Sequence, residues 1–98
     1  MKSDNTQSTS DIRIKTIDLE VGEVSPWHFH TEVIENIRCL AGEIKLQYGN
    51  SGQFIVLYPG QEYEIAPRIA HNLVNLSSEK STYLLQQKGH YDFVISHS

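Results

Sequence analysis

The sequence has 98 residues, of which 39% are hydrophobic and 20% charged, and its formal net charge is −4. This length suits one hydrophobic core, so we expect a single domain. A negatively charged chain without a cluster of lysines and arginines is poorly suited to a phosphate backbone, so we expect no nucleic-acid partner. No apolar run approaches the ~20 residues of a membrane-spanning helix, so we expect no membrane partner either.

The first ten residues are polar and offer nothing to bury. We therefore expect residues 1–10 to be a disordered tail and residues 11–98 to be the folded domain. The same tail lacks the apolar stretch of a signal peptide. The chain has one cysteine, Cys39, and cannot form an internal disulfide, which agrees with a reducing compartment. These features predict a cytoplasmic protein.

The segment over residues 11–19 alternates apolar and charged side chains. Ile12 and Ile14 are separated from each other by a charged residue. This is the period of a strand with one buried face, so we expect the two isoleucines to form that face. We also expect this strand to lie at the edge of a sheet.

The segment from Gly22 to Gly42 contains the residues best suited to chemistry. His28 and His30 project from the same face of an extended strand, so their imidazoles can converge on one point. A short bend after them would bring Glu35 to the same point with an oxygen donor. These three side chains suit a metal ion whose fourth ligand comes from elsewhere in the chain.

More strand-like segments follow, separated by glycine and proline. Residues 43–48 alternate, and the GNSG turn at 49–52 suits a hairpin into the apolar residues 53–58. The remaining strand-like runs cover residues 62–65, 81–87 and 90–95. Many short strands without helical periodicity predict an all-β sandwich or barrel.

The run from Phe54 to Tyr58 is apolar on both faces. Such a strand is either covered on both sides or forms a subunit contact, and in so small a protein the contact is the more economical explanation. We therefore expect a homodimer. Residues 11–17 are a second candidate contact, because edge strands can pair across subunits.

Two spaced patterns in the chain resemble the signature motifs of the cupin superfamily. The first motif, G(X)5HXH(X)4E(X)6G, is matched at every fixed position, by Gly22, His28, His30, Glu35 and Gly42. The resemblance implies that the whole of residues 11–98 forms one small antiparallel jelly-roll β-barrel.

The second cupin motif, G(X)5PXG(X)2H(X)3N, is matched by Gly60, His71 and Asn75. Ala66 and Arg68 depart from it, because they stand where the motif has proline and glycine. A glycine at such a position usually accepts a positive φ, so the turn at Arg68 is either rebuilt or mildly strained. The resemblance makes His71 the fourth metal ligand.

Strand parity agrees with this ligand set, since alternate residues share a face. If Glu35 and His71 point inward, several apolar side chains do too and form a dry interior. The residues predicted to point inward are Ile37, Cys39, Ile44, Leu46 and Leu73. Cys39 is predicted to be an apolar wall residue rather than a nucleophile. The tyrosines that could line the mouth of a pocket are Tyr63, Tyr83 and Tyr91.

Three imidazoles and one carboxylate suit one divalent transition metal per chain (Fe, Mn, Ni, Co, Cu or Zn) and leave one or two positions of an octahedral ion open. Metal-dependent cupins include dioxygenases, oxalate-degrading enzymes, isomerases and decarboxylases. Our first hypothesis is a metalloenzyme, an oxidoreductase of dioxygenase type, in which Glu35 is catalytic and accepts a proton from a small organic substrate. The alternatives are a metal-dependent isomerase or decarboxylase, and a non-enzymatic protein that binds or senses a metal or small ligand.

Overall fold

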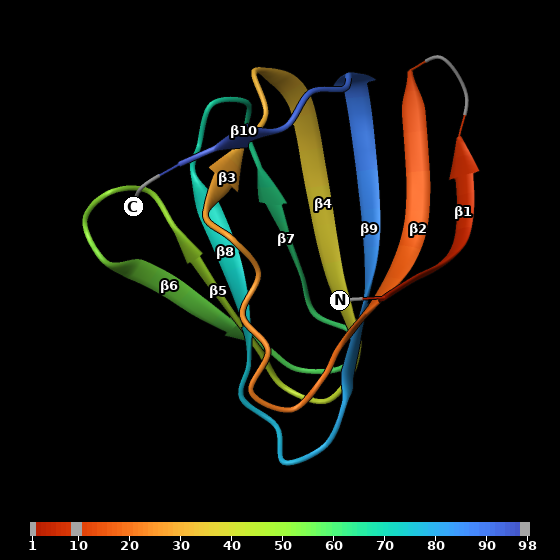
Figure 1. Cartoon of the computed structure of the whole chain (residues 1–98), viewed down its shortest axis with the longest axis vertical. Coiled ribbons are helices and arrows are strands. Elements are labelled where there is room, and N and C mark those ends of the chain that lie inside the picture. Colours follow the sequence, from red (N-terminus) through yellow and green to blue (C-terminus); the bar gives the residue numbers. More distant parts are fainter. Residues whose placement is uncertain (1, 9–10, 97–98) are drawn as a thin grey trace.

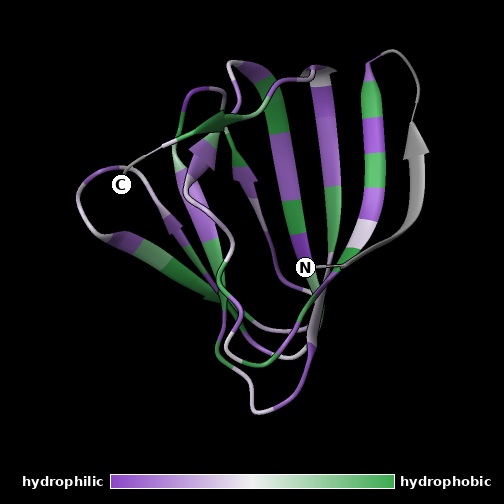
Figure 2. Ribbon diagram, in the orientation of Figure 1, coloured by the Kyte–Doolittle hydropathy of each residue, from purple (hydrophilic) through white to green (hydrophobic). Residues whose placement is uncertain are grey.

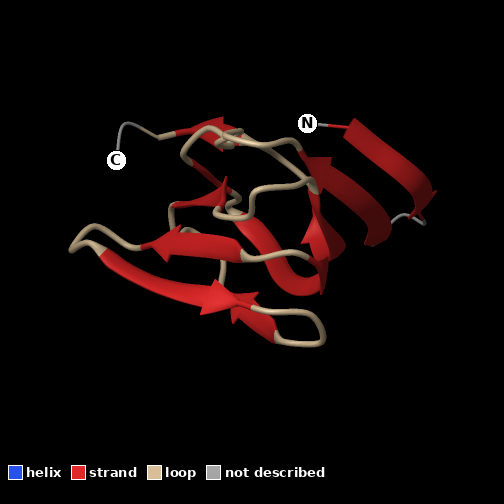
Figure 3. Ribbon diagram, turned by 90° about the horizontal axis from the view of Figure 1, so that it is seen from below, coloured by secondary structure: helices blue, strands red, loops and turns tan. Residues whose placement is uncertain are grey.

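Ten strands make up the computed structural model, which describes residues 2–8 and 11–96. The strands are β1 (Lys2–Ser8), β2 (Ile12–Leu19), β3 (His28–Phe29), β4 (Glu32–Ala41), β5 (Ile44–Tyr48), β6 (Gln53–Leu57), β7 (Glu62–Ile65), β8 (His71–Asn75), β9 (Ser81–His90) and β10 (Val94–Ile95). Figure 3 shows strands and loops only, and the described part of the chain contains no helix that could cross a membrane.

The strands form two antiparallel sheets that face each other (Figure 1). One sheet has the order β1-β2-β9-β4-β7, and the other has the order β10-β3-β8-β5-β6. The predicted all-β jelly roll is therefore confirmed. The predicted closure into a barrel is not: among the described residues the hydrogen-bonded ladders stay within each sheet, so the jelly roll is an open sandwich.

The N-terminal residues differ from the expected disordered tail. Residues 2–8 form β1, which pairs antiparallel with β2. Backbone groups at a sheet edge can bind any extended segment, because the ladder does not need apolar side chains. Residues 1 and 9–10 lie outside the described part of the chain. Since β2 is flanked by β1 and β9, it is not the edge strand that we predicted, and residues 11–17 offer no free edge to a second subunit.

The inward face of β2 also differs from the prediction. Ile17 and Leu19 are buried, so the residues of the same parity, Arg13 and Lys15, point to the interior side. Ile12 is 40% exposed on the outer side. The alternation is visible along β2 in Figure 2. The N-terminal half of β2 extends past the core to the mouth of the cavity described below. Charged side chains on its inward face can still reach water there.

The core lies between the two sheets, and each sheet contributes buried apolar side chains to it. Its members are Ile17, Leu19, Ile37, Cys39, Ile44, Leu46, Leu57, Ile65, Leu73, Tyr83 and Leu85. All five residues that we predicted to point inward belong to it. Full burial of a side chain of this kind contributes about 1.5–3 kcal/mol to folding. Burial raises the pKa of the Cys39 thiol, which fits a wall residue and not a nucleophile.

The turn before β8 is strained rather than rebuilt. Arg68 has a φ of 69°, and it is the only non-glycine residue of the described chain with a positive φ. Its backbone N–H donates to the carbonyl of His30 across 2.7 Å. The turn therefore ties the segment after β3 to the start of β8, where the cupin motif normally has a glycine.

The strain at Arg68 predicts that Arg68→Gly stabilises the protein. A left-handed conformation costs an L-residue about 1–2 kcal/mol, and glycine removes this strain. Glycine also makes the unfolded chain more flexible, which offsets part of the benefit, so we expect the free energy of unfolding to rise by roughly 0.5–1 kcal/mol. Urea denaturation measures the change. Arg68→Ala is the control, because it removes the same charge but keeps the strain. Equal stability of the glycine and alanine variants would contradict the assignment.

Candidate metal centre

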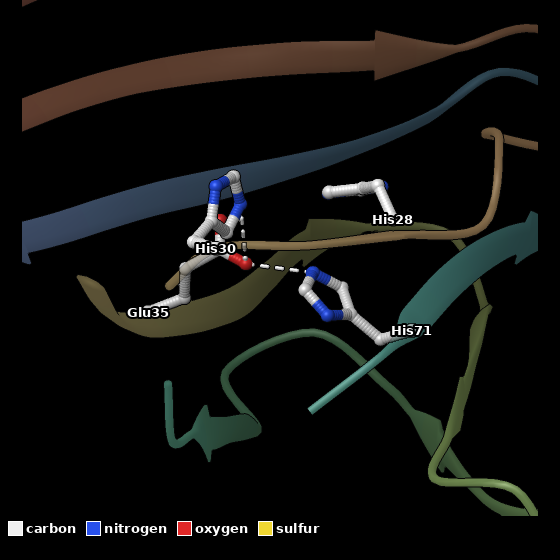
Figure 4. A group of neighbouring side chains, drawn as sticks. All are labelled: His28, His30, Glu35 and His71. Atoms are coloured by element: carbon white, nitrogen blue, oxygen red, sulfur yellow. Dashed lines mark ion pairs between the residues drawn. The ribbon is translucent and has the colours of Figure 1, made fainter. Parts of the chain in front are cut away.

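The four predicted ligands converge between the two sheets. His28 lies on β3 and pairs directly with His71 at the start of β8, while His30 follows β3 and Glu35 lies on β4 in the other sheet. Their candidate ligand atoms all lie within 4.8 Å of one another. The structure therefore brings all four residues together, as Figure 4 shows.

A backbone carbonyl fixes the orientation of each imidazole through its Nδ1 atom. The three pairs are His28 with Pro26 (2.8 Å), His71 with Ile69 (2.9 Å) and His30 with Asp92. A carbonyl only accepts hydrogen bonds, so Nδ1 has to carry the proton. In the neutral ring this leaves a lone pair on Nε2, the tautomer that binds metals when a backbone group holds the other nitrogen.

Glu35 is the only oxygen donor of the group, and it is held from two sides. Gln87 donates from Nε2 to Glu35 Oε2 across 2.8 Å, and the two residues are cross-strand partners on β9 and β4. Glu35 Oε1 lies 2.7 Å from His71 Nε2 and 3.3 Å from His30 Nε2 (Figure 4). The amide of Gln87 therefore keeps one oxygen occupied and turns the other toward the histidines.

The buried atoms of this group fit a metal ion. His30 Nε2 and Glu35 Oε1 are buried, and despite their short separation neither makes a hydrogen bond of good geometry. In the neutral tautomer these atoms are all electron-pair donors, and their approach is unfavourable unless a positive charge lies among them. Three imidazole nitrogens and one carboxylate oxygen are a donor set that divalent transition metals bind.

The pKa values of the group indicate that, without a metal, a proton on His30 supplies the positive charge beside Glu35. Burial alone would raise the pKa of Glu35, but His30 and His71 beside it hold that pKa well below its usual range. Burial lowers the pKa of His28. Burial also acts to lower the pKa of His30, but contact with Glu35 and its charge reverse this, so the pKa of His30 is raised. A metal has to displace the proton from His30, so metal affinity falls as pH falls below this raised pKa.

A cavity of about 250 Å³ opens beside the four residues. Its walls are mostly apolar, and they include Ile17, Ile37, Leu73, Tyr83, Leu85 and Phe93. Of the five apolar residues that we expected to line the interior, Ile37 and Leu73 reach the cavity and the other three belong to the core below it. Tyr83 and Tyr91 line the cavity, whereas Tyr63 stacks on Tyr48 with ring centroids 5.1 Å apart and is not among its lining residues.

Sequence reasoning missed the residues that support the ligands from the end of the chain. Asp92 accepts from His30 through its carbonyl, and its carboxylate accepts from the N–H and hydroxyl of Thr31 (2.8 and 2.7 Å). Phe93 stacks on the His28 ring with centroids 4.4 Å apart. Like Gln87, these residues carry no local signal, because only the strand pairing brings them to the site.

The family of the chain follows from a match over most of its sequence. The sequence model described as "Cupin domain" matches residues 15–86. The chain belongs to the cupin family. The three histidines and the glutamate of the two expected motifs lie at the site, and the departures at Ala66 and Arg68 are confined to the turn before β8. No functionally curated protein matches this cupin significantly.

Solved structures share the fold. A Klebsiella pneumoniae protein with a double-stranded β-helix domain is 18% identical, with a TM-score of 0.85 over 94% of this chain and 80% of that chain. An oxalate oxidase is 16% identical, with a TM-score of 0.78 over 87% of this chain and 46% of that chain. The Cupin_2 domain of an XRE family transcriptional regulator from Enterobacter cloacae is 26% identical, with a TM-score of 0.72 over 85% of this chain and 84% of that chain. At 16–18% identity the likeness shows the fold alone.

Replacing a ligand histidine is expected to remove the metal. Protein purified without added chelator should contain about one metal per chain, and His30→Ala or His71→Ala should lower the affinity by more than ~100-fold, since even supporting residues contribute up to that factor. Elemental analysis after desalting measures the content. His90→Ala, at an exposed histidine outside the group, is the control. Full occupancy in both ligand variants would show that the metal lies elsewhere.

Proposed function

We propose that this cupin is a metalloenzyme that oxidises a small organic substrate with O2, using one divalent transition metal held by His28, His30, Glu35 and His71. The observation that carries the proposal is the convergence of three imidazoles and one carboxylate on the wall of a small, mostly apolar cavity. When bound, a metal with one or two open coordination positions supplies Lewis acidity and, if redox-active, one-electron chemistry with O2.

Glu35 is the proposed proton acceptor. Its lowered pKa keeps the carboxylate ionised, as a metal ligand has to be. The same shift makes it a weak base, so the proposed proton transfer requires His30 and His71 in the neutral form in which they would hold a metal. The hydrogen bond from Gln87 holds Oε2, which leaves Oε1 as the atom that turns toward the cavity and the imidazoles. The role of Gln87 is to position this carboxylate.

The cavity walls support a reaction that is sensitive to water. Ile17 and Leu85 come from the sheet that carries Glu35, and Leu73 comes from the opposite sheet. Apolar walls on both sides keep bulk water away, which strengthens electrostatic contacts with a bound substrate and limits side reactions.

Two other functions use the same residues. The 26% identity to the Cupin_2 domain of a transcriptional regulator favours a non-catalytic, ligand-sensing domain as the second candidate. A metal-dependent isomerase or decarboxylase needs the same ligands but no O2. Within one fold, activity is decided by the site and not by the architecture, so the reaction itself has to separate these candidates.

Oxygen uptake tests the proposed function. Protein loaded with Fe, Mn, Ni or Cu should consume O2 with at least one small diketone, enol, thiol or diacid. Glu35→Gln should retain part of the metal and lose about 10²-fold or more in turnover, whereas Glu32→Gln, at an exposed position on the same strand, should not. Conversion under nitrogen without oxygen uptake would rule out the oxidase and favour the isomerase or decarboxylase. Binding without any turnover would favour the sensor.

We also propose that the protein is a homodimer joined through the run from Phe54 to Tyr58, which covers most of β6 and the residue after it. Phe54 is 55% exposed and Tyr58 is 49% exposed, and Phe54 carries Lys45 Nζ 4.6 Å above its ring. Light scattering at micromolar concentration should give about twice the chain mass of 11.2 kDa, and Phe54→Asp should give the monomer. Val21→Asp, at another exposed apolar residue, is the control. A wild-type mass near 11.2 kDa would contradict the dimer.

A further inference from the structure

Two cations lie on the inward face of β2, and the metal group does not use them: Lys15 lines the cavity, and Arg13 lies beside it on the ring of Tyr91. Arg13 and Lys15 share the inward parity of Ile17 and Leu19. Within residues 11–96, no ion pair involves either cation. A lysine or arginine that is partly withdrawn from water normally has a carboxylate partner.

Arg13 is held in place, and one of its guanidinium nitrogens has no acceptor among the described residues. Its guanidinium carbon lies 3.8 Å from the centroid of the Tyr91 ring, and Tyr91 lines the cavity with its ring 5.5 Å from that of His30. Nη1 of Arg13 is buried and has no hydrogen-bond partner. A buried charged donor without an acceptor is costly, so the arrangement is suited to receiving an anion.

Strand register places Arg13 in the same cross-strand row as Glu35. Arg13 pairs with Gln87 across β2 and β9, and Gln87 pairs with Glu35 across β9 and β4. With neighbouring strands about 4.8 Å apart, the backbones of Arg13 and Glu35 are separated by roughly 10 Å along one row of the sheet. A ligand that touches the metal group can therefore extend toward the cations across the same concave face.

The charge balance of the cavity favours a negative ligand. Lys15 and Glu35 are the formally charged members among the described residues that line it. A divalent ion exceeds the charge of Glu35, so the loaded cavity is positive, and a positive cleft with apolar walls concentrates anions. Burial and the neighbouring charge of Arg13 lower the pKa of Lys15, and a bound anion would relieve both effects.

We propose that the ligand of this cavity is a small dicarboxylate: one carboxylate binds at the metal, and the other is held by Lys15 and Arg13. This assignment rests on the proposed metal site and names the substrate class for it. The volume of about 250 Å³ is small for a ligand pocket, which suits an acid of a few carbons. Charge-assisted hydrogen bonds to Lys15 and Arg13 would select for the second carboxylate.

Calorimetry on zinc-loaded protein tests the assignment without any turnover. Succinate is the probe, and butyrate, which has the same carbon chain and one carboxylate, is its comparator. Wild type should bind succinate at least about tenfold more tightly than butyrate. Lys15→Met should lose about tenfold or more for succinate with butyrate unchanged, and Lys15→Arg should restore most of this loss. Lys88→Met is the control. Lys88 is an exposed lysine on the outward face of β9, so its replacement makes the same charge change and should leave succinate binding as in the wild type.

The outcomes separate this inference from the proposed function. Absence of zinc binding in the wild type would refute the metal site, and with it the ligand. Stoichiometric zinc with equal affinity for succinate and butyrate, or equal losses in Lys15→Met and Lys88→Met, would overturn the dicarboxylate and leave the metal site intact. If circular dichroism shows that Lys15→Met is unfolded, Arg13→Gln and the wild-type selectivity decide the same question.

Discussion

The buried carboxylate of Glu35 is the constraint on which the site depends. It lies between two sheets, 2% exposed, with two imidazoles facing one of its oxygens. Such a charge is stable only beside a positive charge, which a proton or a metal ion can supply. The carbonyl bonds to the three Nδ1 atoms, the amide of Gln87 and the turn at Arg68 all act to hold the donors around this point.

The two sheets have different tasks in this arrangement. The sheet with β2, β9 and β4 supplies the carboxylate, its amide partner and the two cations, whereas His28 and His71 come from the opposite sheet. The metal group and Lys15 therefore line one cavity together with apolar side chains from both sheets, and Arg13 lies beside it on the ring of Tyr91. Metal binding and anion binding are expected to reinforce each other, because the metal adds positive charge to the cavity and the anion neutralises it.

The ligands could be predicted from the sequence because their spacing is local and their chemistry is distinctive. His28 and His30 lie on one short segment, and the motif around His71 fixed its place despite the departure at Arg68. Gln87 could not be found in this way, because only the pairing of β4 with β9 brings it to Glu35. The pattern around Ile12 was misread because hydrophobic alternation does not indicate which face borders a cavity. Residues 2–8 were misread because backbone pairing leaves no trace in composition.

The central claim is that three imidazoles and one carboxylate hold one metal, and X-ray absorption at the metal edge of zinc-loaded protein tests it most directly. His28 is the informative position, because it makes no ion pair with Glu35 and its role depends on the metal alone. The account predicts scattering from three imidazoles with metal–ligand distances of about 2.0–2.2 Å in the wild type and from two imidazoles in His28→Ala. A spectrum without imidazole scattering, or one that His28→Ala leaves unchanged, would contradict it.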